Sequence, residues 1–200
     1  YEVYLAGIHA QRGVACADCH MPYRREGGEK FTDHHIQSPL NNIANSCQVC
    51  HRESEETLRQ NVFERQDKIR ELRLKAEDIL VRAHVEAKAA WDAGAGEDEM
   101  KNVLQLIRKA QWRWDFAAAG HGSSFHAPLE IMRILGHAID LAQQARLELN
   151  TILIKRGVAL PVAMPDISTK EKAQSYIGLD MPAFIQEKKE FLESLTGREK

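Results

Sequence analysis

Cysteine and histidine form two copies of one pattern in the first quarter of the sequence. The pattern Cys-x-x-Cys-His occurs at 16–20 and again at 47–51. One helical turn presents both thiols on the same side, where they form thioethers with the two vinyl groups of one porphyrin, and the next His binds the iron as its proximal ligand. The sequence therefore predicts two c-type haems, with His20 and His51 as proximal ligands and all four cysteines as attachment points: Cys16, Cys19, Cys47 and Cys50.

Zinc is the main alternative chemistry for these cysteines. Two Cys-x-x-Cys pairs also occur in four-thiolate zinc sites, and the same spacing is compatible with disulfides. Neither zinc nor a disulfide needs a His directly after the second Cys, whereas that His is present in both motifs. We therefore favour haem and keep a zinc-dependent helical scaffold as the alternative.

A c-type haem needs a second axial ligand on its iron unless the iron is a reaction site. Met21 follows His20 on the proximal side and does not reach the distal face, so we expect histidine as the distal ligand. Seven histidines remain: His9, His34, His35, His84, His121, His126 and His137. We favour those outside the expected helices, namely His9, His34 and His126. The residues alone do not decide between His34 and the adjacent His35.

Composition sets wider limits on function. The chain has 200 residues, 44% of them hydrophobic, which suffices for one core or for half of a larger one. A formal net charge of -2 gives no case for nucleic acid or an anionic membrane surface. No apolar run approaches the length of a membrane span.

The start of the sequence and the predicted haems bear on processing and location. The sequence begins at Tyr1 without a signal peptide, so we expect a processed or partial chain. Covalent haem attachment predicts a periplasmic location.

The elements that position these residues differ between two parts of the chain. Residues 1–52 are rich in Gly, Pro and Asn and have weak periodicity, so we expect an irregular dihaem-binding segment. Apolar residues then recur every three or four positions, which predicts helices over about 54–93, 96–119 and 128–156. The expected fold is all-α, with an irregular multihaem segment (1–52) followed by a long-helix bundle and dimerisation region (53–200), and without strands.

The third expected helix carries an apolar stripe that only Arg146 interrupts. Such a stripe is typical of a coiled coil or of a plain bundle face. After an extended linker, Ser168 followed by Glu171 predicts a capping box and a short helix. Asp180-Met181-Pro182 predicts the start of a last helix. The stripe consists of Met132, Leu135, Ile139, Ala142, Leu149 and Leu153.

Beyond these patterns, the sequence resembles the C-terminal part of the pentahaem cytochrome c nitrite reductases, which form ammonia. The resemblance covers nearly all of the chain. The matching segments are 4–9, 16–22, 32–34, 47–51, 110–115, 126–128 and 165–173. It implies that the two motifs hold the fourth and fifth haems of five.

The same resemblance implies a role for three further histidines. His126 would be the distal ligand of the haem on the first motif. His9, seven residues before Cys16, would be the distal ligand of the haem on the second motif. His34, rather than His35, would bind the second haem of the family, which is attached outside these residues.

The resemblance also implies the setting in which the chain works. The family forms homodimers through its long helices, which the stripe fits, takes electrons from a cytochrome or quinol dehydrogenase, reduces nitrite and binds calcium. Its reaction haem uses Cys-x-x-Cys-Lys, which these 200 residues lack, so we expect no catalytic residue here. The expected role is to supply two electron-transfer haems and the dimer helices. A stand-alone dihaem electron carrier is the second hypothesis.

Overall fold

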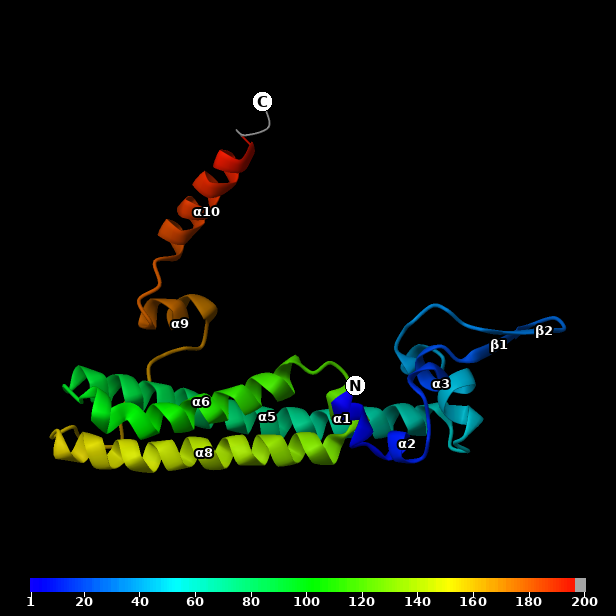
Figure 1. Cartoon of the computed structure of the whole chain (residues 1–200), viewed down its shortest axis with the longest axis horizontal. Coiled ribbons are helices and arrows are strands. Elements are labelled where there is room, and N and C mark those ends of the chain that lie inside the picture. The colour runs from blue at the N-terminus through cyan, green and yellow to red at the C-terminus, as the bar shows by residue number, and fades with distance from the viewer. Residues whose placement is uncertain (197–200) are drawn as a thin grey trace. The chain divides into compact units, whose positions relative to one another are not determined.

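Three long helices form the main body of the protein. The structure is a computed structural model that describes residues 1–196, with side chains to residue 195. The helices are α5 (Glu55–Asp92), α6 (Glu97–Ala119) and α8 (Pro128–Lys155), and they run side by side (Figure 1). The predicted all-α fold is confirmed.

The ends of these helices follow from local signals in the sequence. The Ser54 hydroxyl accepts a hydrogen bond from the Thr57 backbone N–H at 3.2 Å and caps α5. Gly94, with a φ of 82°, follows the end of α5 in the left-handed region that favours glycine. Pro128 is the first residue of α8, where its missing N–H costs no helical hydrogen bond. The three predicted helices are thus confirmed, with small differences at their ends.

The core lies between the facing sides of α5, α6 and α8. It contains two clusters of buried side chains: Ile69, Ala76, Ala117, Ile131 and Leu135, and then Ile79, Leu80, Ala110, Leu141 and Ala142. The stripe on α8 belongs to this core, because Leu135, Ala142, Leu149 and Leu153 are all 0% exposed within the chain's own bundle. Most of the stripe is therefore a bundle face, although Met132 is 43% exposed, and the expected dimer role of the long helices stays a prediction.

The N-terminal segment consists of short elements at one end of the bundle (Figure 1). A further short helix, α7 (Ser123–His126), lies between α6 and α8 and contacts α1. The N-terminal elements are α1 (Glu2–Leu5), α2 (Ile8–Gln11), α3 (Cys16–His20), β1 (Tyr23–Glu26), β2 (Glu29–Thr32), η1 (Pro39–Asn41), α4 (Ile43–Ser46) and η2 (Cys47–Val49).

The strands β1 and β2 correct the expectation of a chain without strands. They pair antiparallel, with Tyr23 opposite Thr32 and Glu26 opposite Glu29, across a Gly27-Gly28 turn. Gly27 has a φ of 61°, which suits a tight hairpin. The strands are exposed and mostly polar, so no alternation of apolar residues marked them. The Gly-Gly pair was the one usable signal.

The last part of the chain forms a second compact unit, which begins at Pro161. It contains α9 (Lys170–Tyr176) and α10 (Met181–Thr196), both of which were predicted. The cap of α9 differs from the prediction, because the hydroxyl of Thr169 accepts from the Lys172 N–H, whereas that of Ser168 donates to Asp166 Oδ1 at 2.7 Å. The predicted division into 1–52 and 53–200 stays a prediction. No helix in the described residues is long and apolar enough to cross a membrane.

Candidate functional site

The two Cys-x-x-Cys-His motifs adopt tight helical turns. The first motif is the one-turn helix α3, and the Ala15 N–H at its start donates to Asp18 Oδ2 at 2.7 Å. The second motif begins as the 3₁₀ turn η2, and the His51 N–H donates to the Cys47 carbonyl at 2.9 Å. Both turns present the residues of one motif together, as porphyrin attachment requires.

The four thiols are free, and α3, which holds the first motif, contacts α4, which directly precedes the second motif. Burial raises the pKa of the Cys19 thiol, and the nearby Cys47 thiolate raises this pKa further. A four-thiolate zinc site would need these groups to converge on one point. Across the described residues, no group of three or more His, Cys, Asp or Glu side chains is arranged to hold a metal ion.

The structure brings four of the predicted histidines together in two pairs. The ring centroids of His20 and His126 are 6.1 Å apart, and those of His9 and His51 are 6.2 Å apart. Metal–imidazole bonds are about 2 Å long, so two imidazoles on opposite sides of one metal ion have ring centres about 6 Å apart. Each pair thus has the spacing of two axial ligands on one iron. Within each pair, one His follows a Cys-x-x-Cys and the other comes from a different element.

In each pair, the histidine from outside the motif has a lowered pKa, which favours the neutral form that binds metals. Burial lowers the pKa of His126, and the neighbouring His20 lowers it further. Burial also lowers the pKa of His9, with a second contribution from His51. A metal binds the lone pair of a neutral imidazole, so a lowered pKa keeps both rings available at neutral pH.

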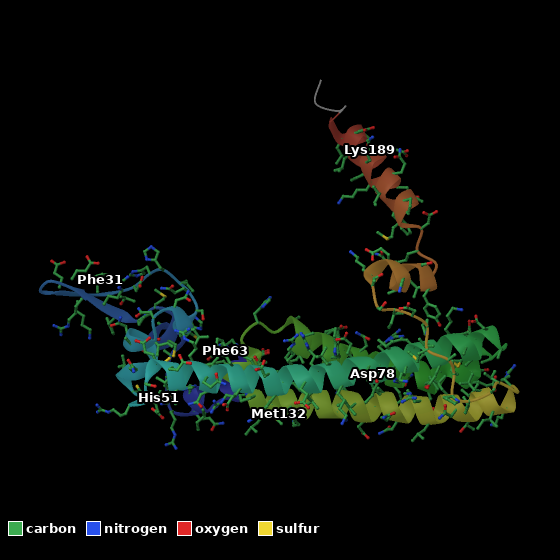
Figure 2. The ribbon with its side chains drawn as sticks, turned by 180° about the vertical axis from the view of Figure 1, so that it is seen from behind. Phe31, His51, Phe63, Asp78, Met132 and Lys189 are labelled. Atoms are coloured by element: carbon green, nitrogen blue, oxygen red, sulfur yellow. The ribbon has the colours of Figure 1, made fainter. Side chains whose placement is uncertain are left out.

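His20 has a partner that fixes its tautomer. Its Nδ1 lies 2.8 Å from the carbonyl oxygen of Gln37, which can only accept a hydrogen bond. Nδ1 therefore carries the proton, and Nε2 keeps the lone pair for a metal. His51 has a weaker neighbour, because its Nδ1 is 3.8 Å from the Glu53 carboxylate. Figure 2 shows His51 beside the N-terminal end of α5.

The adjacent His34 and His35 differ in their surroundings. Asp33 is buried, and its Oδ1 accepts from both the backbone N–H and Nδ1 of His35, each at 3.0 Å. Arg24 donates to the other oxygen of Asp33 at 3.3 Å. These contacts hold the loop after β2, and the hydrogen bond from the His35 N–H is the main cause that lowers the pKa of Asp33. His34 is exposed on this loop and is not part of either histidine pair.

The histidines of the long helices have contacts typical of surface residues. His84 on α5 has Nε2 3.4 Å from the side-chain oxygen of Gln111 on α6. His137 on α8 accepts from Arg113 Nε at 3.3 Å. Neither contact involves a residue of a Cys-x-x-Cys-His motif.

Sequence reasoning missed three residues that pack against His9 and His126. The Tyr4 ring lies edge-on to His126 with centroids 5.6 Å apart, and the Phe125 ring lies 5.7 Å from that of His9. A Cβ on Gly7 would lie 1.8 Å from the His126 carbonyl oxygen, so only glycine fits there. The usable signal was position, because Tyr4 and Gly7 lie in the segment before His9 and Phe125 directly precedes His126.

Comparison with known proteins gives one family. The family model for cytochrome c552 matches residues 1–200. Proteins described as cytochrome c-552 are 64% identical over 196 residues in Parabacteroides distasonis (98% of this chain, 40% of the relative) and 63% identical over 194 residues in Bacteroides thetaiotaomicron (97% and 39%). One from Maridesulfovibrio salexigens is 51% identical over 196 residues (98% and 39%). The chain thus spans about 40% of the length of these curated relatives.

A solved structure gives a similar fold. It is the cytochrome c nitrite reductase from Desulfovibrio desulfuricans, described as a catalytic subunit with two calcium sites. The match has a TM-score of 0.69 at 33% sequence identity, and it covers 76% of this chain and 33% of that chain.

Proposed function

The chain belongs to the cytochrome c552 family, and on that basis we propose that it is the electron-transfer part of a multihaem, ammonia-forming cytochrome c nitrite reductase. Membership of a cytochrome c family implies haem c as the prosthetic group. The similarity to the nitrite reductase from Desulfovibrio desulfuricans supports nitrite as the substrate of the whole protein. The substrate, the electron donor and the periplasmic location belong to this proposal.

The observation that carries the proposal is the spacing of the two histidine pairs. We assign Cys16 and Cys19 to one haem, with His20 as the proximal ligand and His126 as the distal ligand, whose rings are 6.1 Å apart. We assign Cys47 and Cys50 to the second haem, with His51 as the proximal ligand and His9 as the distal ligand. The centroids of these two rings are 6.2 Å apart. The residues present therefore fit two haems. Bound haem iron supplies reversible one-electron chemistry.

The protein's own residues set the conditions for that chemistry. Thioether bonds from the cysteines keep the groups attached whatever the oxidation state. Distal histidine in place of methionine favours a lower reduction potential, because thioether ligation raises the potential. The hydrogen bond from His20 Nδ1 to the Gln37 carbonyl fixes the tautomer and the orientation of this ring.

His34 has a separate role in the proposal. It is exposed on a loop that Asp33 holds, and it takes no part in the two histidine pairs. We assign it as a ligand to a haem attached elsewhere in a longer polypeptide, in keeping with curated relatives of which this chain spans about 40%. The proposed whole enzyme is a homodimer with five haems and calcium. It receives electrons from a cytochrome or a quinol dehydrogenase.

Substitution of each distal ligand tests the haem assignment. In His126→Ala and His9→Ala, we expect both haems to stay attached, because their thioethers are intact, and one iron per chain to lose its distal ligand. The measurement is carbon monoxide binding to the reduced protein, with one additional CO per chain over the unsubstituted protein. His137→Ala, on the surface of α8, is the control and adds none. An unchanged low-spin spectrum and CO count in both variants would contradict the assignment.

A stand-alone dihaem electron carrier is the second candidate function. It is favoured by one observation, namely that both histidine pairs are complete within this chain. The intact mass of the native polypeptide and its haem count distinguish the two functions. Two haems on a polypeptide of this length support the carrier, whereas five haems and a Cys-x-x-Cys-Lys motif support the reductase.

A further inference from the structure

The two proposed distal ligands are held by elements that touch at a glycine. Gly7 lies two positions before His9 and is the N-cap of α2, which carries His9. A Cβ at this position would lie 1.8 Å from the carbonyl oxygen of His126 and 2.9 Å from its carbonyl carbon. The φ of Gly7 is -91°, so glycine is needed here for close approach and not for backbone conformation.

Aromatic contacts cross between the same two elements. Tyr4, on α1, lies edge-on to His126 at 5.6 Å, and Phe125, on α7, lies 5.7 Å from His9. The Tyr4 hydroxyl donates to the Val14 carbonyl, and the Val14 N–H donates to the His9 carbonyl at 3.0 Å. His126 is therefore packed by a residue on α1, which adjoins the helix that carries His9. His9 in turn is packed by a residue on α7, the helix that carries His126.

We propose that Gly7, Tyr4 and Phe125 form a distal clasp that positions His9 and His126 as one unit. The clasp rests on the proposed roles of these histidines as distal ligands. Gly7 is a positioning residue, because it contacts a ligand's backbone and not a haem iron. Its consequence is that a change at Gly7, where the two elements meet, disturbs both distal ligands, although the ligands are 117 residues apart in the sequence.

The size of the steric conflict decides what a methyl group does at Gly7. Carbon and oxygen atoms out of bonding contact need more than 3 Å, so an added Cβ moves the two backbones apart by about 1.5 Å. Ligand constellations have to be held to within about 0.5 Å. Since Phe125 packs on His9 and Tyr4 packs on His126, the displacement reaches both rings.

The experiment is Gly7→Ala in the haem-loaded protein, read out by CO binding to the reduced form. We expect two additional CO molecules per chain over the unsubstituted protein, against one each for His9→Ala and His126→Ala. Gly28→Ala is the matched control, because Gly28 has open space around it and no positive φ. It should add none. Haem content and helical circular dichroism report whether each variant is folded.

The crossed contacts supply a second test if Gly7→Ala does not fold. Phe125→Ala should displace His9 from its proposed iron, although Phe125 is the neighbour of His126 in the sequence. We therefore expect Phe125→Ala to add one CO in a His126→Ala background and none in a His9→Ala background. A purely local role of Phe125 gives the reverse pattern and overturns the clasp.

The outcomes separate the clasp from the haem assignment. A folded Gly7→Ala protein that binds no more than one additional CO overturns the clasp, while single-histidine variants that each bind one still support the proposed ligands. If neither His9→Ala nor His126→Ala binds additional CO, the ligand assignment is wrong and the clasp is wrong with it.

Discussion

At the scale of single residues, Arg146 shows how a sequence irregularity becomes a structural contact. Its guanidinium donates to both carboxylate oxygens of Glu86 on α5, at 2.7 to 3.1 Å. The Glu86 side chain is 7% exposed and that of Arg146 is 24% exposed. The sequence marked Arg146 as the interruption in an apolar stripe, but nothing in it identified a partner 60 residues earlier on another helix.

The ion pair gives a prediction for stability. Arg146→Met should lower the free energy of unfolding by roughly 3 kcal/mol, because it leaves the Glu86 carboxylate buried without a partner. Glu86→Leu combined with Arg146→Met should recover most of this loss, since neither charge is then buried. Denaturant unfolding followed by circular dichroism measures both values. A double variant as unstable as Arg146→Met would show that the pair itself, and not the uncompensated charge, provides the stability.

At the scale of elements, the start of α6 and the end of α8 are joined through Glu99. The Gly96 N–H donates to this carboxylate at 3.1 Å, and Arg156, which follows α8, also donates to it. The hydrogen bond from Gly96 is the main cause that lowers the pKa of Glu99, and Arg156 is the second. The contact therefore combines an N-terminal capping interaction with an ion pair.

The lowered pKa of Glu99 predicts a pH dependence. A carboxyl group whose pKa is lower in the folded state stabilises the fold above its unfolded pKa, and this contribution disappears as the pH falls through the folded value. Glu99→Gln should therefore lower the melting temperature at neutral pH, and the difference from the unsubstituted protein should shrink towards zero in acid. Thermal unfolding at a series of pH values tests this. A difference that is constant with pH would exclude the carboxylate as its origin.

The sequence predicted those elements that are determined by residues close together in the chain. Helix periodicity and caps such as Ser54 and Pro128 are local, so α5, α6 and α8 were predicted with nearly correct ends. The hairpin at Gly27 was missed because its strands bury no apolar face. In the site, the motifs were visible as spacing, and the resemblance supplied His9 and His126 as expected distal ligands. Contacts such as that of Gly7 with the His126 carbonyl needed the structure, because they join distant segments.

At the scale of the whole molecule, the proposed homodimer needs an apolar surface outside the bundle core. The outward face of α8 provides one, because four large apolar side chains are exposed along it: Leu129 (81%), Met132 (43%), Leu147 (68%) and Ile154 (63%). Leu129 and Leu147 are about five helical turns apart and therefore lie on the same side of the helix. Figure 2 labels Met132 on this helix. The dimer proposal thus depends on the exposed side of α8, which includes Met132 from the edge of the stripe but none of its four fully buried residues.

Charge placed on this face should separate the subunits. In Leu147→Glu/Ile154→Glu, association would bury two unpaired carboxylates per subunit, so we expect the dimer to dissociate at concentrations where the unsubstituted protein stays dimeric. Sedimentation equilibrium measures the mass, and the visible spectrum should not change because these residues lie far along α8 from His126. Leu104→Glu, at an exposed leucine on α6 (41% exposed), is the matched control and should leave the dimer intact. Dissociation by the α6 variant, with the α8 variant still dimeric, would assign the interface to α6.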